Sequence, residues 1–142
     1  LGHGGTAALF GGEGAAPIDG GEGDDYLYGN QGDDVIIGGA GDDHIKGGKG
    51  ADVLEGGEGH DTFIYDRLSE AGDTIKDFHD GQDVLDLREV MRVAGDHATV
   101  EITQGGTGAE VWIHTGAEDV LLTTVEGVTH DQLQIGDDVL IS

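Results

Sequence analysis

The stretch GGAGDDHIKGGKGADVLE, residues 38–55, consists of two nine-residue blocks that repeat one pattern. Each block opens with two glycines and has a third glycine at position four, an Asp at position six and a bulky aliphatic residue at position eight. Glycine permits the positive backbone φ angles of a tight turn, and the last three residues of each block have the pattern of a short strand. A turn and a strand on a strict nine-residue period predict a solenoid.

The same phase extends to both sides of this stretch. Blocks beginning at residues 20, 29, 38, 47 and 56 share an Asp at position six and an apolar residue at position eight. The shared aspartates are Asp25, Asp34, Asp43, Asp52 and Asp61, and the apolar residues are Leu27, Ile36, Ile45, Leu54 and Phe63. Two earlier blocks keep the glycine and apolar positions but have Ala7 and Ala16 in place of Asp. If alternate blocks stack, the apolar residues fill a thin core between two parallel sheets, and the aspartates form two columns.

The composition indicates that the fold depends on a cation. The 142 residues include 29 glycines and 30 acidic residues but only 6 Lys plus Arg, for a formal charge of -24. Such a chain should be disordered unless something neutralises it. The lack of a basic patch disfavours nucleic acid and anionic membrane surfaces as partners. No cysteine is present, so disulfides and Cys-ligated zinc are excluded, and no apolar run has the length of a membrane span.

The repeats are similar to a known family. The pattern GGxGxDxUx, where U is a large apolar residue, resembles the calcium-binding nonapeptide of RTX proteins and covers residues 2–64. The resemblance implies an all-β fold, a right-handed parallel β-roll. Residues 2–19 are degenerate repeats and residues 20–64 are full repeats. The carboxylate and carbonyl oxygens of such a roll suit Ca²⁺, whereas Mg²⁺ retains its waters and demands octahedral geometry.

The resemblance also implies where several calcium ions bind. Each ion lies between turns i and i+2, held by backbone carbonyls and by two position-six aspartates. Asp25 then pairs with Asp43, Asp34 with Asp52, and Asp43 with Asp61, giving three fully formed sites and incomplete sites at the ends. Asp43 would serve two ions. The implied carbonyl positions are the glycines at positions one and four of each block: Gly20, Gly23, Gly29, Gly32, Gly38, Gly41, Gly47, Gly50, Gly56 and Gly59. The position-five residues Asp24, Asp33 and Asp42 are expected to be outward-facing charges.

The second half, residues 65–142, loses the nine-residue period. Short strands are expected near residues 74–78 and 84–87, with a turn at Asp80–Gly81. Residues 98–103 and 109–114 alternate like a β-hairpin around QGGTG, residues 120–128 read as a buried strand, and DDVLIS reads as a final strand. The only helical candidate is a short turn near residues 87–93.

This half also resembles a family. DTFIYD…GDTIKDFHDGQDVLDL is similar to the segment that follows the repeats in type I secretion substrates, and DDVLIS to their C-terminal secretion signals. The resemblance implies a β-rich cap on the roll, in which Asp73 and Asp77 complete the last calcium sites. The alternative is that both are surface residues flanking strands, and the sequence does not decide between these readings.

Catalytic motifs are absent from the sequence. The two serines, Ser69 and Ser142, lie outside any GxSxG, and neither HExxH nor a phosphate-binding loop occurs. The seven histidines are scattered and are expected at the surface. We therefore expect no catalytic residue and no enzyme activity in this chain. Its first residue is Leu1 rather than Met, so we expect a piece of a longer protein whose active site, if any, lies elsewhere.

The sequence thus predicts a calcium-triggered folding module carrying the C-terminal type I secretion signal of a larger exported bacterial protein. Its expected partners are Ca²⁺ and the secretion machinery, and its expected location is extracellular or at the cell surface. The alternative is a Ca²⁺-dependent polysaccharide- or cell-surface-binding module of an adhesin or a polysaccharide-modifying enzyme. Direct binding to a polyanion is disfavoured, because only 6 basic residues could meet it.

Overall fold

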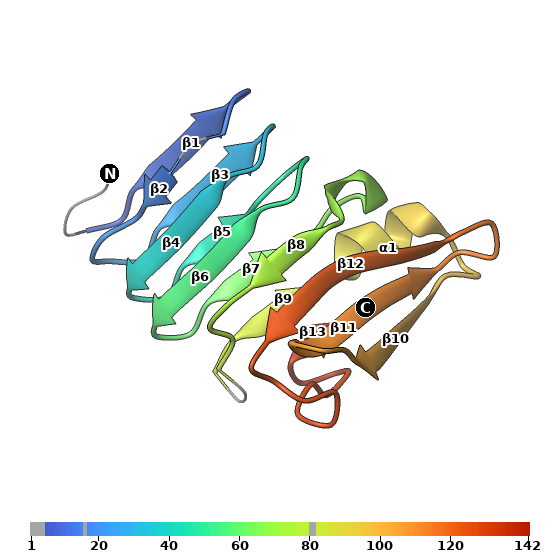
Figure 1. The fold of residues 1–142 in the computed structure, drawn as a ribbon. Coiled ribbons are helices and arrows are strands. Elements are labelled where there is room, and N and C mark those ends of the chain that lie inside the picture. Colours follow the sequence, from blue (N-terminus) through green and yellow to red (C-terminus); the bar gives the residue numbers. More distant parts are fainter. Residues whose placement is uncertain (1–4, 16, 80–81) are drawn as a thin grey trace.

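In the computed structural model, two sheets face each other and the repeats pass from one sheet to the other (Figure 1). The structure describes residues 5–15, 17–79 and 82–142. Ala16 and the turn expected at Asp80–Gly81 lie outside the described residues. The predicted all-β parallel roll is confirmed, with one short α-helix added in the second half.

Odd-numbered repeat strands form one sheet and even-numbered repeat strands the other. The six-stranded sheet is ordered β1 (Ala8–Gly12), β3 (Tyr26–Asn30), β5 (His44–Lys46), β7 (Thr62–Ile64), β9 (Val84–Asp86) and β13 (Val139–Leu140). The seven-stranded sheet is ordered β2 (Pro17–Asp19), β4 (Val35–Ala40), β6 (Val53–Glu58), β8 (Asp73–Ile75), β12 (Asp119–Glu126), β11 (Gly108–His114) and β10 (Thr99–Gln104).

The position-eight residues form the core, as the repeat predicts. In the six-stranded sheet Leu27 is in register with Ile45, and Ile45 with Phe63, while in the seven-stranded sheet Ile36 is in register with Leu54. All five side chains are buried. Each nine-residue block therefore contributes only one large side chain to the layer between the sheets, so the core is thin.

The sheets continue beyond residue 64, although the nine-residue period does not. Leu54 pairs with Ile75 and Phe63 with Leu85, so the spacing between stacked positions grows from 18 to 21 and 22 residues. The extra residues include the 3₁₀ turn η1 (Leu68–Glu70), which the sequence did not predict. Strand pairing stays parallel across this change, and the cap begins as a direct continuation of the roll.

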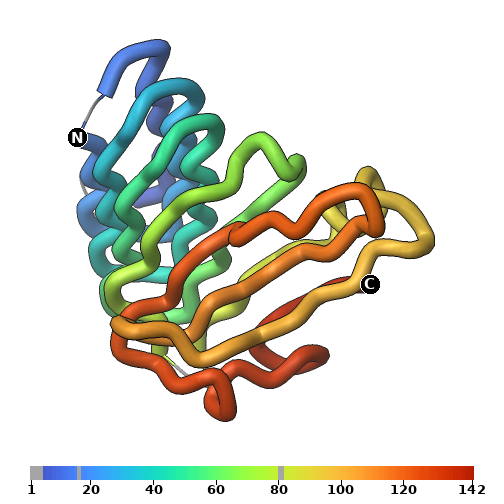
Figure 2. Tube along the Cα trace, turned by 45° about the vertical axis from the view of Figure 1, so that its right-hand side comes forward, coloured from blue at the N-terminus to red at the C-terminus, as the bar shows by residue number. Residues whose placement is uncertain are grey.

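The rest of the cap is an antiparallel extension of the seven-stranded sheet. β10, β11 and β12 pair antiparallel with each other, and β12 pairs parallel with β8. Figure 2 shows these strands running out beside the stacked coils. The expected hairpin is confirmed as β10 and β11, and the expected helical turn is α1 (Arg88–Ala94). The final strand is shorter than expected, since only Val139 and Leu140 pair, with β9.

We expect steric contact between neighbouring coils to make glycine essential at Gly57. Its φ is +89°, and an added Cβ would collide with the carbonyl oxygen of Gly39 in the next coil. Gly72 has a similar φ of +106° but nothing within 4 Å of its Cβ position. Gly72→Ala should therefore cost only the left-handed backbone strain, about 1–2 kcal/mol. Gly57→Ala should add a packing cost of about 1–3 kcal/mol.

Urea unfolding of both variants in excess calcium measures this difference. Equal losses in the free energy of unfolding would show that the coils do not approach each other as closely as the structure places them.

Candidate metal centre

Buried aspartates form two ladders along the roll. All five position-six aspartates are at most 1% exposed. The Oδ1 atoms of four of them, Asp25, Asp43, Asp52 and Asp61, each accept a hydrogen bond from a backbone N–H one coil earlier. Asp43 accepts from Asp25 at 2.9 Å, Asp61 from Asp43 at 3.0 Å, and Asp52 from Asp34 at 2.7 Å. Parallel stacking thus places identical carboxylates above one another, and the two columns expected from the sequence are present.

Both columns extend into the cap. Asp73 accepts a hydrogen bond from the Asp52 N–H, and Asp83 accepts one from the Asp61 N–H, both at 2.9 Å. We call Asp25, Asp43, Asp61 and Asp83 the first column, and Asp34, Asp52 and Asp73 the second column. The sequence predicted Asp73 as a site residue but missed Asp83. Residues 83–85 read DVL, as residues 52–54 do, and this shared triplet was the signal for Asp83.

Asp77, the other predicted cap residue, lies at the end of the first column and contacts a turn. Its two carboxylate oxygens accept hydrogen bonds from the N–H groups of Gly56 at 2.8 Å and Gly57 at 2.7 Å. Its charge also contributes to raising the pKa of Asp61 and of Asp83. The structure therefore brings Asp77 close to the first column, with both of its oxygens already accepting from the protein.

The second carboxylate oxygens in the columns lack protein donors. The Oδ2 atoms of five buried aspartates have no hydrogen-bond partner: Asp25, Asp43, Asp52, Asp61 and Asp73. A buried, unpaired carboxylate oxygen is costly, so such a row of atoms indicates a missing positive partner. This row of oxygens fits a metal ion.

Glycine carbonyls converge on the same places. At Gly20, an added Cβ would lie 2.5 Å from the Gly38 carbonyl oxygen and 2.8 Å from Asp25 Oδ2. At Gly38, the carbonyl oxygen of Gly56 and Oδ2 of Asp43 would each lie at 2.5 Å. The absence of a side chain at position one thus leaves a space lined by a carbonyl and a carboxylate oxygen, which are the hard ligands that Ca²⁺ prefers.

The protonation behaviour of the columns reflects this crowding. Burial, with repulsion from neighbouring carboxylates, raises the pKa of Asp43 and of Asp52 to about 6, of Asp61 to about 7 and of Asp73 to about 8. At neutral pH Asp43 and Asp52 are therefore mostly ionised, whereas Asp61 is about half protonated and Asp73 is mostly protonated. Among the described residues, no group of three or more His, Asp or Glu side chains could hold a metal ion. Backbone carbonyls must therefore supply part of any metal site here.

The comparison with family models identifies the repeats. The model of the RTX calcium-binding nonapeptide repeat, which spans four copies, matches residues 10–45 and 28–63. Residues 10–63 are RTX calcium-binding nonapeptide repeats. The chain therefore carries a calcium-binding repeat module, as the sequence predicts.

Solved structures that are similar to the chain include two subunits of one enzyme, and no curated protein matches it. The AlgE6R2 subunit from the Azotobacter vinelandii mannuronan C5-epimerase is 24% identical over 94% of this chain and 91% of its own, with a TM-score of 0.54. The AlgE6R3 subunit of that enzyme is 25% identical over 100% of this chain and 81% of its own, with a TM-score of 0.47. The likeness to AlgE6R2 shows that this chain shares its fold.

The position-five aspartates of the RTX repeats have a different role, and their predicted exposure is confirmed. Asp24 accepts a hydrogen bond from the Asp42 N–H at 2.8 Å, and Asp33 accepts one from the Ala51 N–H at 2.9 Å. These exposed carboxylates link neighbouring coils by hydrogen bonds at their outer edges. Their exposure separates them from the buried columns.

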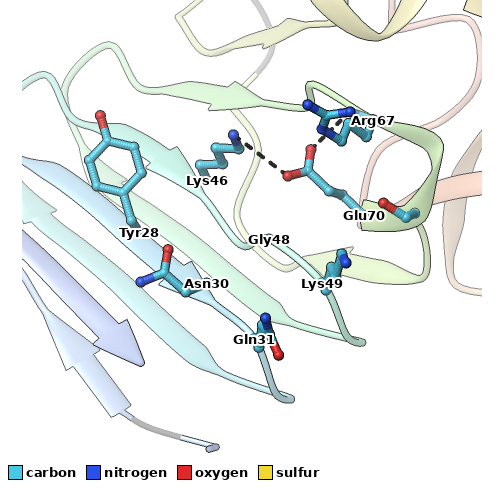
Figure 3. Close-up of a pocket in the computed structure, with 9 residues that line it drawn as sticks. Tyr28, Asn30, Gln31, Lys46, Gly48, Lys49, Arg67 and Glu70 are labelled. Carbon is cyan, nitrogen blue, oxygen red and sulfur yellow. Dashed lines mark hydrogen bonds and ion pairs between the residues drawn. The ribbon is translucent and has the colours of Figure 1, made fainter. Parts of the chain in front are cut away.

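A hollow of about 360 Å³ lies on the outer side of the RTX roll (Figure 3). Lys46, Lys49 and Arg67 line it, so half of the 6 basic residues of the chain meet at one place. Lys46 pairs with Asp66 and Glu70. Among the described residues, neither Lys49 nor Arg67 forms an ion pair through its side chain. Glu70 also lines the hollow, so its excess positive charge comes from Lys49 and Arg67.

A stacked pair of aromatic rings lies at the edge of this hollow. Phe10 stacks on Tyr28 with ring centroids 5.1 Å apart, and Tyr28 itself lines the hollow beside Asn30 and Gln31. Phe10 is 65% exposed.

Within the part of the chain that the structure describes, no helix has the length and apolar character needed to cross a membrane.

The metal-free RTX module should lose stability as pH rises. Between the unfolded Asp value of 3.8 and the raised folded values, the folded state binds more protons than the unfolded state. The free energy of unfolding therefore falls as pH increases through this window, from about pH 4 to about pH 8. Circular dichroism of the calcium-free chain should show more β-structure at pH 5 than at pH 8.

Two substitutions separate the columns from other titrating groups. Asp73→Asn should flatten the pH dependence, because it removes the group with the highest of these pKa values. Asp96→Asn, at an exposed position in the cap, should leave the slope unchanged. A calcium-free fold whose stability is constant or rises between pH 5 and pH 8 would contradict this account of the columns.

Proposed function

We propose that this chain folds when calcium binds between its stacked coils, outside the cell. The observation that carries the proposal is the row of buried Oδ2 atoms without hydrogen-bond partners beside glycine carbonyls. An ion at each of these places would neutralise the two carboxylates that flank it and satisfy the carbonyls. Since the site forms only in the folded roll, binding free energy becomes folding free energy.

The proposed ligands are the aspartates of adjacent coils and the carbonyls of the position-one and position-four glycines. Asp25 with Asp43 and Asp43 with Asp61 would hold two ions in the first column. Asp34 with Asp52 would hold one in the second column. Calcium suits these sites because it accepts many oxygen ligands in flexible geometry, whereas magnesium dehydrates reluctantly.

We further propose that the module belongs to a larger bacterial protein exported by type I secretion. A charge of -24 and a core one residue wide per block favour an unfolded chain where calcium is scarce. Extracellular modules bind calcium at about 10⁻⁴–10⁻³ M, so the ion could trigger folding after export. The C-terminal segment, with its resemblance to secretion signals, would act before folding. No catalytic step is assigned to this chain.

A second candidate function is binding of an acidic polysaccharide or of a cell surface that carries one. The paucity of basic residues disfavours contact along a whole polyanion. The gathering of Lys46, Lys49 and Arg67 in one hollow supports local contact with an anionic group instead. Arg and Lys bind oxyanions, and the stacked Phe10–Tyr28 pair offers an aromatic face beside them. This combination suits a sugar that carries a carboxylate.

Calcium should convert a largely unstructured chain into a β-roll. Circular dichroism in EGTA and in millimolar calcium measures the change, with magnesium at the same concentration as the control. Asp43→Asn should raise the calcium concentration at the folding midpoint by about tenfold or more, because it weakens two proposed sites. Asp96→Asn, at an exposed residue outside the roll, should leave the midpoint unchanged. A chain that is as structured in EGTA as in millimolar calcium would contradict the proposal.

The calcium-loaded module should bind a short acidic oligosaccharide through the hollow. Titration with tetragalacturonate, followed by NMR chemical shifts, should perturb residues around Lys49, whereas neutral maltotetraose should not. Lys49→Gln should weaken binding about three- to tenfold, since a charged hydrogen bond is lost at an exposed site. Lys76→Gln, which removes the same charge from a residue paired with Glu126, should have no effect. Equal effects of the two variants would rule out the hollow as the binding place.

A further inference from the structure

The two aspartate columns end differently at the cap. In the first column, Asp83 has both carboxylate oxygens engaged. Its Oδ1 accepts from the Asp61 N–H at 2.9 Å, and its Oδ2 accepts from the His79 N–H at 2.8 Å. The protein itself therefore satisfies the last carboxylate of the first column, which needs no further partner.

The second column ends with its last carboxylate half satisfied. Asp73 Oδ1 accepts from the Asp52 N–H, but Asp73 Oδ2 has no hydrogen-bond partner, and neither does Asp52 Oδ2. Asp73 is 2% exposed and Asp52 is 1% exposed, so water does not reach these oxygens freely. The second column is thus open where the first is closed.

A third buried oxygen faces the same place. Tyr65 is 1% exposed, and its hydroxyl has no hydrogen-bond partner in the structure. The carboxylate that acts most strongly on this hydroxyl is that of Asp73, followed by that of Asp52, and the side chain of Thr123 is also adjacent. A buried tyrosine hydroxyl normally has a partner. Here the hydroxyl lies within reach of the Asp73 carboxylate and the Thr123 hydroxyl, but in poor geometry for a hydrogen bond to either.

We propose that Asp52, Asp73 and the Tyr65 hydroxyl form a further calcium site at the junction of roll and cap, with Tyr65 as a ligand. The inference rests on the proposed function, since it requires calcium in the columns. A cation between these groups would satisfy all three oxygens that the protein leaves without partners. A hydrogen bond from Tyr65 to Asp73 alone would leave Asp52 Oδ2 unsatisfied.

The position of this site gives it a structural consequence. Asp52 precedes β6 of the roll and Asp73 opens β8 of the cap. The Asp73 carbonyl accepts a hydrogen bond at 3.2 Å from the hydroxyl of Thr123, which lies in β12. The antiparallel strands β10 and β11 are attached to the roll through β12. An ion held by Asp52, Asp73 and Tyr65 would therefore fasten the antiparallel part of the cap to the last coil.

Tyr65→Phe tests the site in the complete, calcium-loaded chain. Phenylalanine fills the same space and removes only the hydroxyl oxygen. If Tyr65 merely packs in the core, losing an unsatisfied hydroxyl should leave calcium binding unchanged and the fold as stable or more stable. If Tyr65 is a ligand, equilibrium dialysis should show one bound calcium fewer than in the wild type, or about tenfold weaker uptake of one ion.

Two further variants complete the test. Tyr28→Phe removes an outer-face hydroxyl and should leave calcium uptake unchanged. Asp73→Asn should lose the same single ion as Tyr65→Phe, and the double variant should lose no more than Asp73→Asn alone. Wild-type uptake by Tyr65→Phe, in number of ions and affinity, would overturn this site. A wild-type chain that takes up no calcium would overturn the proposed function as well.

Discussion

Repulsion between like charges stacked in register is the constraint on which the rest of this structure depends. Parallel pairing of blocks eighteen residues apart places each position-six aspartate directly above its counterpart. Like charges placed directly opposite each other destabilise a sheet, and here they are also buried. The backbone offers each carboxylate one N–H, which satisfies one oxygen. The other oxygen needs a positive partner, and the glycines at position one leave the space for it.

Because the core is small, apolar burial alone cannot offset the repulsion between the stacked carboxylates. Each full repeat adds one large apolar side chain between the sheets, and its neighbours along the strand face outward. A solenoid is stabilised by contacts between adjacent coils, so no distant part of the fold can compensate for a weak interface. Cations in the columns would act at every such interface. The spacing that stacks the aspartates thus creates both the repulsion and a place for a cation between adjacent coils.

The sequence predicted the parts of this structure that follow its period. The turn glycines, the one-residue core and the two columns all come from positions that recur every nine residues. Asp83 escaped because the spacing between stacked positions grows to 22 residues at the cap, so the register could not be extended by counting. Tyr65 lies outside the repeat phase and follows β7 of the six-stranded sheet, so no local pattern predicts that its hydroxyl lies beside Asp73 of β8 in the other sheet. The basic hollow joins residues of different coils, and no local pattern brings Lys49 to Arg67.

The alternation of strands between the two sheets also restricts how such a roll can change in length. Removing a single nine-residue block would preserve the period but transfer every later strand to the opposite sheet. β8, which now continues the seven-stranded sheet into β12, would then follow the six-stranded sheet, and the two aspartate columns would exchange their ends. Asp83, whose two carboxylate oxygens accept hydrogen bonds, and Asp73, whose Oδ2 has no partner, would then each end the other column. Rolls with this cap should therefore differ by even numbers of repeats, and duplications in their genes should occur in units of eighteen codons.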